Sequence, residues 1–575
     1  MTRVLNDPPD FAREALEGLV AANRRLLRLV PGGVIRAAPA KTGTIAVIIG
    51  GGSGHYPAFA GLVGRGLAHG AVVGNIFSSP SAQQACSVAR HAHRGGGVLF
   101  CYGNYAGDVL HFSAALDQLT AEGIENSQVL VTDDVSSASA DEISKRRGIA
   151  GDLVVFKIAG AAADRGYSLA EVTRLAELAN QRTRSFGIAF AGCTLPGAQD
   201  PLFTIPAKRM AVGMGIHGEP GIGEAELPRA DELADLLVTR LLGEPPAGAD
   251  APGEAVVLLN GLGSVKYEEL FVLYRRVDEL LGQAGVRVVE PEVGELVTSL
   301  DMAGVSLTLC WLTGELADLW HAPAEAPGFR KGTLPPLAAV PAQPAPRAPA
   351  ARTRVPAASQ PSRAAARVVC AALDAARQAI EANTHELRRL DAIAGDGDHG
   401  DAMLRGATAA AKAARTALGN GAGAGETLKT AAAEWSDASG GASGALWGTG
   451  LRALGQVIGD ENPPTAADMA TAVQHWSEEV MRVGGAAPGD KTMVDVLVPF
   501  AAALTQHVGE SMPLGDAWAE AVVAAEAAAE ATKDLVPRVG RARPLAARSA
   551  GNPDAGAISL ALVLRAVEPV MRRSP

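Results

Sequence analysis

The chain has 575 residues, of which 48% are hydrophobic and 20% charged, and its formal net charge is −11. A chain of this length can bury substantial cores and divides into several domains, whereas its acidic balance argues against a nucleic-acid-binding surface. Five scattered cysteines without CxxC pairing, and apolar runs shorter than the ~18 to 20 residues of a membrane span, predict a soluble protein of the reducing cytoplasm that does not enter membranes.

The part of the chain before residue 335 alternates short apolar runs with helix-like sequence. Each run ends in Gly, Asn or Asp, and several lead into a helical pattern. We therefore predict α/β structure within residues 1–334, as one unit or as two subdomains, with a mostly parallel sheet and ligands at the loops after the strands' carboxyl ends. The predicted strands are 44–52, 96–104, 127–134, 151–160 and 254–263.

Three glycine-supported loops in this half each carry a side chain that can act as a nucleophile or move a proton. They are GGGSGHYP with His55, GNYAGD with Asp108 and GMGIHGEP with His217. A lone histidine or aspartate in a loop is usually structural. Three convergent loops at strand ends are less readily explained by turn chemistry and indicate a catalytic site.

Residues 335–363 are rich in Pro and Ala and show no regular spacing of apolar residues that would predict a helix or a strand. Such a segment is a semi-rigid spacer that extends by roughly 3.1 Å per residue where it is polyproline-like. We therefore place a domain boundary here.

From residue 364 to 575 the chain consists of Ala-rich amphipathic segments interrupted by Gly/Asp loops. This pattern predicts an all-helical domain of roughly six to nine helices, given typical helix lengths.

The loop DAIAGDGDHG places Asp391, Asp396, Asp398 and His399 close together around three glycines. Carboxylates held this close repel one another, and a divalent cation such as Mg²⁺ stabilises their charged forms. On spacing alone, a solvated acidic loop is an equally good interpretation, because the pattern is not that of an EF-hand.

Three further glycine-rich loops follow in the helical half, at residues 440–444, 484–493 and 551–556. Glycine-rich turns at helix starts expose backbone N–H groups that can bind phosphates. Any one of them could be an ordinary turn between helices. Four such loops in one helical domain favour a nucleotide-phosphate site, although the chain has no GxxxxGK[ST] motif.

The strings GGGSGH, NYAGD, GMGIHGEPG, DAIAGDGDHG, GGASGALWG, GDKTMVDVL and GNPDAGA occur in this order. In these residues the chain resembles, over nearly its whole length, the single-chain ATP-dependent dihydroxyacetone kinases. The resemblance implies a ketose-binding domain followed by a helical barrel that holds ATP through two Mg²⁺ ions. It also implies a homodimer formed through the first domain.

The resemblance assigns roles to individual residues. It implies that His217 attacks the ketone carbon to form a hemiaminal, and that Asp108 and His55 assist proton transfer. The implied ketose-binding residues are Gly52, Ser53, Gly54, His55, Gly103 and Asp108, and the implied Mg²⁺ ligands are Asp391, Asp396 and Asp398. The implied nucleotide-binding residues are His399, Gly400, Ala442, Ser443, Gly484, Met493, Arg541, Asp554, Ala555 and Gly556.

Three positions depart from the family pattern. The chain has Tyr56 and Phe59 where many dihydroxyacetone kinases have glutamate and histidine in GHEPAH, and Gly103 where they often have lysine. Loss of a long cation beside the substrate could make room for a four-carbon ketose such as erythrulose. The alternative is that dihydroxyacetone remains the preferred substrate.

Other function classes fit the sequence less well. A non-catalytic regulator or ADP-binding subunit should lack the reactive histidine or the three aspartates, and this chain has both. In relatives that depend on the phosphotransferase system, the two halves are separate proteins. A lyase that forms cyclic products from FAD needs the same metal site, and it stays an alternative side activity.

Overall fold

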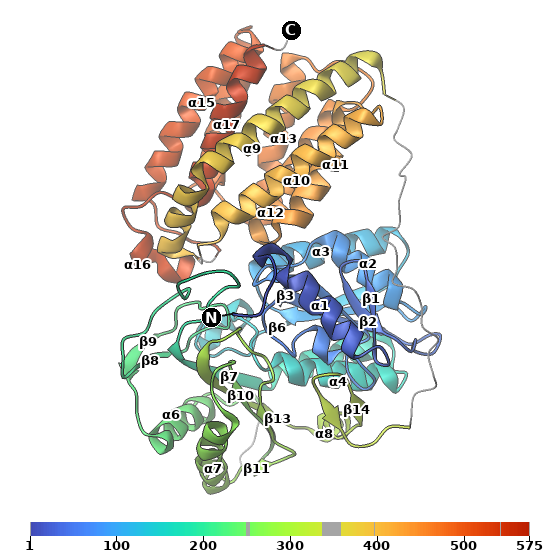
Figure 1. The fold of residues 1–575 in the computed structure, drawn as a ribbon, viewed down its shortest axis with the longest axis vertical. Coiled ribbons are helices and arrows are strands. Elements are labelled where there is room, and N and C mark those ends of the chain that lie inside the picture. The colour runs from blue at the N-terminus through green and yellow to red at the C-terminus, as the bar shows by residue number, and fades with distance from the viewer. Residues whose placement is uncertain (1, 249–252, 336–357, 396, 541, 574–575) are drawn as a thin grey trace. The chain divides into compact units, whose positions relative to one another are not determined.

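The computed structural model describes residues 2–248, 253–335, 358–395, 397–540 and 542–573, which form two compact units, Met1–Pro349 and Ala350–Pro575 (Figure 1). Most of the expected linker lies outside the described residues. The first helix of the second unit, α9 (Gln360–Ala394), begins four residues before the expected boundary at 364. The Ser359 side chain accepts a hydrogen bond from the Ser362 N–H, and Pro361 is tolerated in the first turn, so this earlier start has a physical cause.

The first unit contains a six-stranded sheet in which β4, β3, β5 and β6 are parallel neighbours and β1 and β2 form an antiparallel edge. Its strands, in sheet order, are β1 (Leu27–Val30), β2 (Gly33–Arg36), β4 (Gly70–Ile76), β3 (Ala46–Ser53), β5 (Val98–Gly103) and β6 (Asn126–Val131). Alternate residues of β3 pack into different cores, Ile48 with helices α2 (Ala82–Ala92) and α3 (Ala106–Ala121), and Val47 with α4 (Asp152–Asp164) and α5 (Leu169–Gln181). The sheet is thus covered by helices on both faces, as the continuous apolar strands predict.

A second, seven-stranded sheet completes the first unit. Its elements are β7 (Thr183–Ala191), β8 (Arg209–Val212), β9 (Gly223–Glu226), β10 (Glu254–Gly261), β11 (Arg287–Val288), β12 (Glu292–Gly294) and β13 (Ala303–Trp311). The strand β13 pairs antiparallel with both β7 and β10, while β11 and β12 pair parallel with β10. The α/β class is confirmed, and parallel pairing dominates in the first of the two sheets.

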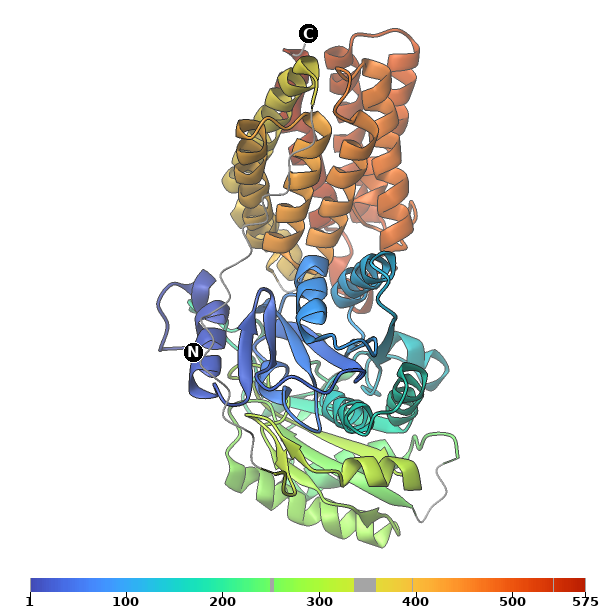
Figure 2. The same ribbon diagram turned by 90° about the vertical axis from the view of Figure 1, so that its right-hand side faces the viewer.

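Helices α6 (Ala230–Leu242) and α7 (Tyr267–Gln283) pack against the second sheet, and Figure 2 shows them along its outer face. The smaller elements of the unit are α1 (Phe11–Ala22), α8 (Gly314–Trp320), β14 (Ala324–Glu325) and β15 (Arg330–Lys331).

The strand predicted at 151–160 is wrong, because these residues belong to helix α4. The residues from Asp152 to Ala163 are all buried. A helix that is apolar on every side has no 3.6-residue alternation, so its run of Val and Phe resembles that of a buried strand.

Helix α4 also buries Lys157 completely. Its Nζ donates a 2.7 Å hydrogen bond to the Leu319 carbonyl in the last turn of α8. Burial, together with nearby Lys331, lowers the Lys157 pKa from 10.5 to about 7. Between these two values the unfolded chain binds more protons than the folded chain, so the free energy of unfolding should rise with pH above 7, by at most about 1.4 kcal/mol per pH unit.

We expect Lys157→Met to flatten this pH dependence, because the variant has no ammonium group to titrate. Urea unfolding of the first unit at several pH values between neutral and alkaline checks it, with Lys145→Met, at an exposed position, as the control. An unchanged slope in Lys157→Met contradicts the assignment.

In the second unit, the described residues form nine α-helices. The first, α9, is followed by α10 (His399–Gly419), α11 (Ala424–Ser439), α12 (Gly441–Ile458), α13 (Ala466–Gly484), α14 (Val494–Gly509), α15 (Leu514–Ala531), α16 (Ala546–Ser549) and α17 (Ala555–Arg572). Each long helix packs against the next, and α17 returns to pack against α9, which closes a ring. The domain is therefore a helical barrel. Among the helices that the structure describes, none has the length and apolar character needed to cross a bilayer.

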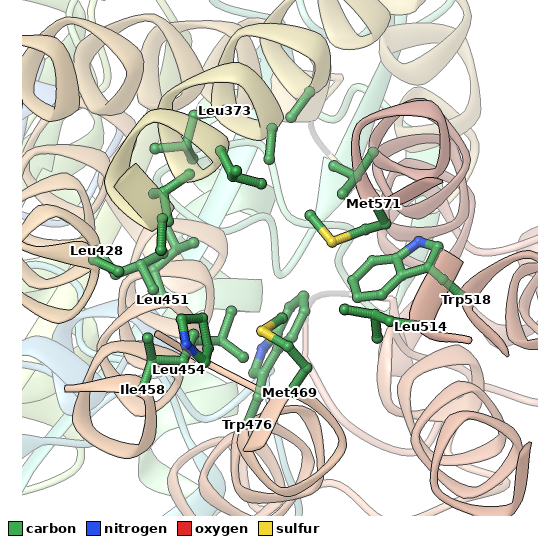
Figure 3. Close-up of a pocket in the computed structure, with 18 of the residues that line it drawn as sticks. Leu373, Leu428, Leu451, Leu454, Ile458, Met469, Trp476, Leu514, Trp518 and Met571 are labelled. Atoms are coloured by element: carbon green, nitrogen blue, oxygen red, sulfur yellow. The ribbon is translucent and has the colours of Figure 1, made fainter. Parts of the chain in front are cut away.

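The helical ring surrounds an apolar cavity of about 480 Å³. Figure 3 shows the Leu, Met and Trp side chains that line it, including Leu451, Met469, Trp476, Trp518 and Met571. Small alanines on the facing helices do not fill the space between these larger side chains. The barrel is thus less densely packed at its centre than a typical domain core.

Candidate functional site

The predicted ketose-binding residues follow two neighbouring parallel strands. Ser53 ends β3, Gly103 ends β5, and the pairing of these strands brings both ends to one edge of the sheet. The next helix, α3, begins at Ala106 and carries Asp108, buried, in its first turn. The strand-end loops thus lie where an α/β sheet is expected to bind ligands.

His55 and His217 contact each other directly, although 162 positions separate them in the chain. Their Nε2 atoms are 3.0 Å apart, and the two rings are nearly perpendicular, at 88°. The Nδ1 atom of His55 is 2.8 Å from the Thr298 carbonyl oxygen and therefore donates to it. Burial and the neighbouring His217 lower the pKa of His55 to about 3, so its ring is neutral at physiological pH.

Two aromatic rings enclose this histidine pair. Phe77 stacks on His55 with ring centroids 5.0 Å apart, and Tyr105 meets His217 edge to face at 4.7 Å. Gly54 has φ +107°, and a Cβ atom there would lie 2.7 Å from the Phe77 ring. Only glycine fits this turn without moving the aromatic wall.

The other side of His217 is held by Glu219. The Nδ1 atom of His217 is 2.9 Å from Glu219 Oε1, and its backbone N–H donates to Oε2 at 2.9 Å. Arg147 lies 3.9 Å from the same carboxylate and forms a 2.8 Å ion pair with buried Asp134. His217 is thus fixed at both nitrogens, with only 9% of its side chain exposed.

Asp108 belongs to a group of acidic side chains near the strand ends. Burial, together with Asp133 and Asp108, raises the pKa of Asp152 well above its usual value. Buried carboxyl groups near one another disfavour each other's ionisation. The part in proton transfer that the resemblance implies for Asp108 stays a prediction.

In the helical unit, the four glycine-rich loops lead into the N-termini of α10, α12, α14 and α17. The His399 ring joins three of these helices, with Nε2 2.9 Å from Ser559 Oγ of α17 and Nδ1 3.3 Å from Ser443 Oγ of α12. The fourth helix, α14, begins close to α17, because a Cβ atom on Gly556 of α17 would lie 3.9 Å from Met493, the residue before α14. Four helix N-termini at one place provide N–H groups and positive dipole ends for phosphates.

These loops also bring carboxylates together. Burial and Asp391 raise the pKa of Asp398 to about 6, and burial, Asp391 and Asp495 raise that of Asp554 to about 6. Such mutual repulsion is relieved by a divalent cation, so the residues present fit Mg²⁺. Within the described residues no three candidate ligands form a preassembled cage, and Asp396 lies outside them.

The remaining predicted nucleotide residues lie at or near the same helix ends. Gly400, Ala442 and Ser443 are in the first turns of α10 and α12, while Ala555 and Gly556 begin α17. Asp554 caps α17 by accepting a hydrogen bond from the Ala557 N–H at 2.8 Å. Gly484 ends α13 and faces Leu446 of α12. The predicted residue Arg541 lies outside the described residues.

Sequence reasoning missed several residues of both sites. Glu219 stands two positions after His217, a spacing that could have suggested a partner for the ring. Ser559 similarly follows the GNPDAG loop. Phe77, Arg147 and Thr298 carry no comparable local signal, because only the tertiary fold brings Phe77 and Thr298 to His55 and brings Arg147 to Glu219.

Two family models match separate parts of this chain. Residues 17–328 match the Dak1 domain and residues 393–568 match the DAK2 domain. The chain is 58% identical to the L-erythrulose kinase of Pectobacterium atrosepticum, over 99% of this chain and 97% of the relative. It is 52% identical to the D-erythrulose kinase of Mycolicibacterium smegmatis, over 99% and 98%. A crystal structure of the C. freundii dihydroxyacetone kinase with AMP-PNP and Mg²⁺ aligns with a TM-score of 0.53 and 28% identity over 99% of both chains.

Proposed function

Since this chain belongs to the dihydroxyacetone kinase family, with Dak1 and DAK2 domains in one polypeptide, we propose that it transfers the γ-phosphate of ATP to a terminal hydroxyl of erythrulose. It is a phosphotransferase that acts on an alcohol group of a short ketose. The proposal further places the ketose domain at residues 1–334 and the ATP domain at 364–575, in a cytoplasmic homodimer.

The paired histidines carry the proposal. Because the Nδ1 atom of His217 is directed at Glu219, its Nε2 atom, 3.0 Å from His55 Nε2, is the nitrogen that can meet a substrate carbonyl. A lone pair on Nε2 can attack the ketone carbon, and the resulting hemiaminal requires an accessible carbonyl group, which gives selectivity for ketoses and aldehydes.

Asp108 accepts the proton of the attacking hydroxyl in this proposal, since a primary alcohol is a poor nucleophile. The helix N-termini around His399 and Ser443 bind the nucleotide phosphates. Asp391, Asp396 and Asp398 hold two Mg²⁺ ions. Bound Mg²⁺ neutralises charge on the phosphoryl group during transfer.

The choice of erythrulose rests on Gly103 and on the relatives. A Cβ atom at Gly103 would lie 3.0 Å from the Tyr105 ring, which itself contacts His217. Any side chain there takes room beside the reactive histidine, and glycine leaves that room free. Phe59 lies edge to face with His55, with ring centroids 6.4 Å apart, so it too contacts the histidine pair, whereas Tyr56 is half-exposed. Gly103 is the departure from the family pattern that leaves space beside Tyr105, which contacts His217.

ATP consumption with Mg²⁺ and dihydroxyacetone, glyceraldehyde, D-erythrulose or L-erythrulose tests the substrate. The highest kcat/KM on an erythrulose supports the proposal, and the enantiomer follows from the same data. Preference for dihydroxyacetone refutes the four-carbon assignment but leaves the kinase assignment intact. Cyclic products from FAD without any ketose reveal the alternative lyase activity.

We expect Gly103→Lys to lower kcat/KM for erythrulose at least about tenfold more than for dihydroxyacetone, because the added side chain displaces Tyr105 or fills the space of the fourth carbon. Steady-state kinetics on both ketoses measure it. Gly223→Lys is the matched control, since a Cβ atom at this exposed strand position meets open space. Equal losses on both substrates argue against a role for Gly103 in chain-length selection.

A further inference from the structure

The polar atoms around the histidine pair form a chain of hydrogen bonds, and the number of contacts in the chain sets how many hydrogens the site must hold. Its links are Thr298 O to His55 Nδ1 at 2.8 Å, His55 Nε2 to His217 Nε2 at 3.0 Å, and His217 Nδ1 to Glu219 Oε1 at 2.9 Å. Each of these three links needs one hydrogen, and the Thr298 carbonyl has none to give. An ionised glutamate with two neutral imidazoles supplies only two.

We infer that the ketose-free site stores a third proton between His55 and His217, that Glu219 is the positioning residue that retains it, and that this stored proton neutralises the oxyanion formed when a ketose binds. The inference rests on the proposed hemiaminal function. It explains why two imidazole nitrogens can lie 3.0 Å apart, since without a proton their lone pairs would repel.

The charges that face the pair support one added proton. Glu219 and Asp134 are acidic, Arg147 is basic, and together they leave one negative charge beside His217. Burial and Glu219 raise the pKa of the Tyr105 phenol well above its usual value, so Tyr105 stays neutral and donates to the Gly148 carbonyl. Phe77, on the remaining side, carries no charge. A single positive charge on the imidazole pair therefore balances the site.

The contacts of the two rings favour placing the stored proton on the His217 side of the pair. Burial and the neighbouring His217 ring lower the pKa of His55 to about 3, which disfavours a positive charge on His55. His217 instead lies against the Glu219 carboxylate, which stabilises an imidazolium. The shared proton can pass across the 3.0 Å contact when His217 Nε2 begins to form another bond.

The binding step balances without any other reactant. The ketone carbon gains a bond to His217 Nε2, and the carbonyl π pair moves to oxygen. The proton shared by the Nε2 atoms goes to that oxygen, which becomes the hemiaminal hydroxyl. His217 then carries a positive charge on a ring with N–C and N–H bonds, still paired with Glu219, and His55 is neutral. The total charge of the site is the same before and after, so ketose binding takes no proton from solvent.

Titration calorimetry with a ketose and no nucleotide tests this, because binding then proceeds without turnover. The observed heat is measured near neutral pH in buffers with very different ionisation enthalpies. We expect the same heat in each buffer, which means no net proton exchange. Uptake of about one proton per site overturns the inference while leaving hemiaminal binding intact. Absence of ketose binding overturns the proposed function, and the inference with it.

The role of Glu219 is tested with Glu219→Gln, in which the neutral amide cannot balance an imidazolium. We expect ketose binding by this variant to take up about one proton per site, and its kcat/KM to depend on pH differently from that of the wild type. Glu224→Gln, an exposed carboxylate paired with Arg209, is the matched control and should behave like the wild type. A Glu219→Gln variant with unchanged proton exchange refutes the positioning role, and the calorimetry of the wild type decides the stored proton independently of how well the variant folds.

Discussion

Replacing His217 with alanine lowers kcat/KM for every ketose by more than about 10³-fold, the range seen when a covalent nucleophile is removed. The loss comes from the carbon–nitrogen bond that alanine cannot form, because the other polar groups of the site, His55 and Glu219, remain in place. Ketose-dependent ATP consumption and the mass of the ketose–protein adduct are the measurements.

The two-unit organisation provides an internal control for this variant. His217 lies in the first compact unit, and the nucleotide loops lie in the second. ATP binding by His217→Ala should therefore equal that of the wild type, and His507→Ala, which changes a surface histidine of the helical unit, should retain full turnover. Substantial ketose phosphorylation by His217→Ala means that the ketose is held without a covalent bond.

The second large effect is expected at Asp398. Asp398→Asn should reduce turnover by at least about 10³-fold, because an amide is a poor ligand for Mg²⁺ and the phosphoryl charge is then less neutralised. In the absence of Mg²⁺ the same variant should melt at a higher temperature than the wild type. Burial and Asp391 raise the pKa of Asp398 to about 6, so at neutral pH its ionised form destabilises the metal-free fold.

Thermal melting with and without Mg²⁺ and ATP separates these two effects. The wild type should gain stability from Mg²⁺–ATP, and Asp398→Asn should gain little. Asp516→Asn, which removes an exposed carboxylate of α15, serves as the control and should match the wild type throughout. A variant that is active and still stabilised by Mg²⁺–ATP contradicts the assignment of Asp398 to the metal.

The sequence predicted most of the fold because local pattern and tertiary role coincide in most elements. The runs that became β3, β5, β6 and β10 are short, apolar and bounded by turn residues. The run at 151–160 has the same appearance, yet it lies in α4, where burial on all sides removes the helical period. The antiparallel pairing of β13 with β7 and β10 could not be predicted either, because strand direction depends on connections far apart in the chain.

For the candidate sites, too, some residues could be predicted from the sequence and others could not. Glycine-rich loops with a reactive side chain were visible as motifs, and the fold brings His55 to His217 and His399 to Ser443 as those motifs suggested. The residues that set the chemical state of these groups were not visible. The Thr298 carbonyl accepts a hydrogen bond from His55 Nδ1 and so fixes the tautomer of His55, and Arg147 lies beside the Glu219 carboxylate. These contacts depend on the packing of two sheets.

The cavity inside the helical ring gives the second unit an unusual volumetric property. Any part of this cavity of about 480 Å³ that holds no water adds volume to the folded domain, and that volume is lost when the chain unfolds. Compression therefore favours unfolding of the ring of α9 to α17. The short alanine side chains that line the cavity thus also make this unit sensitive to hydrostatic pressure.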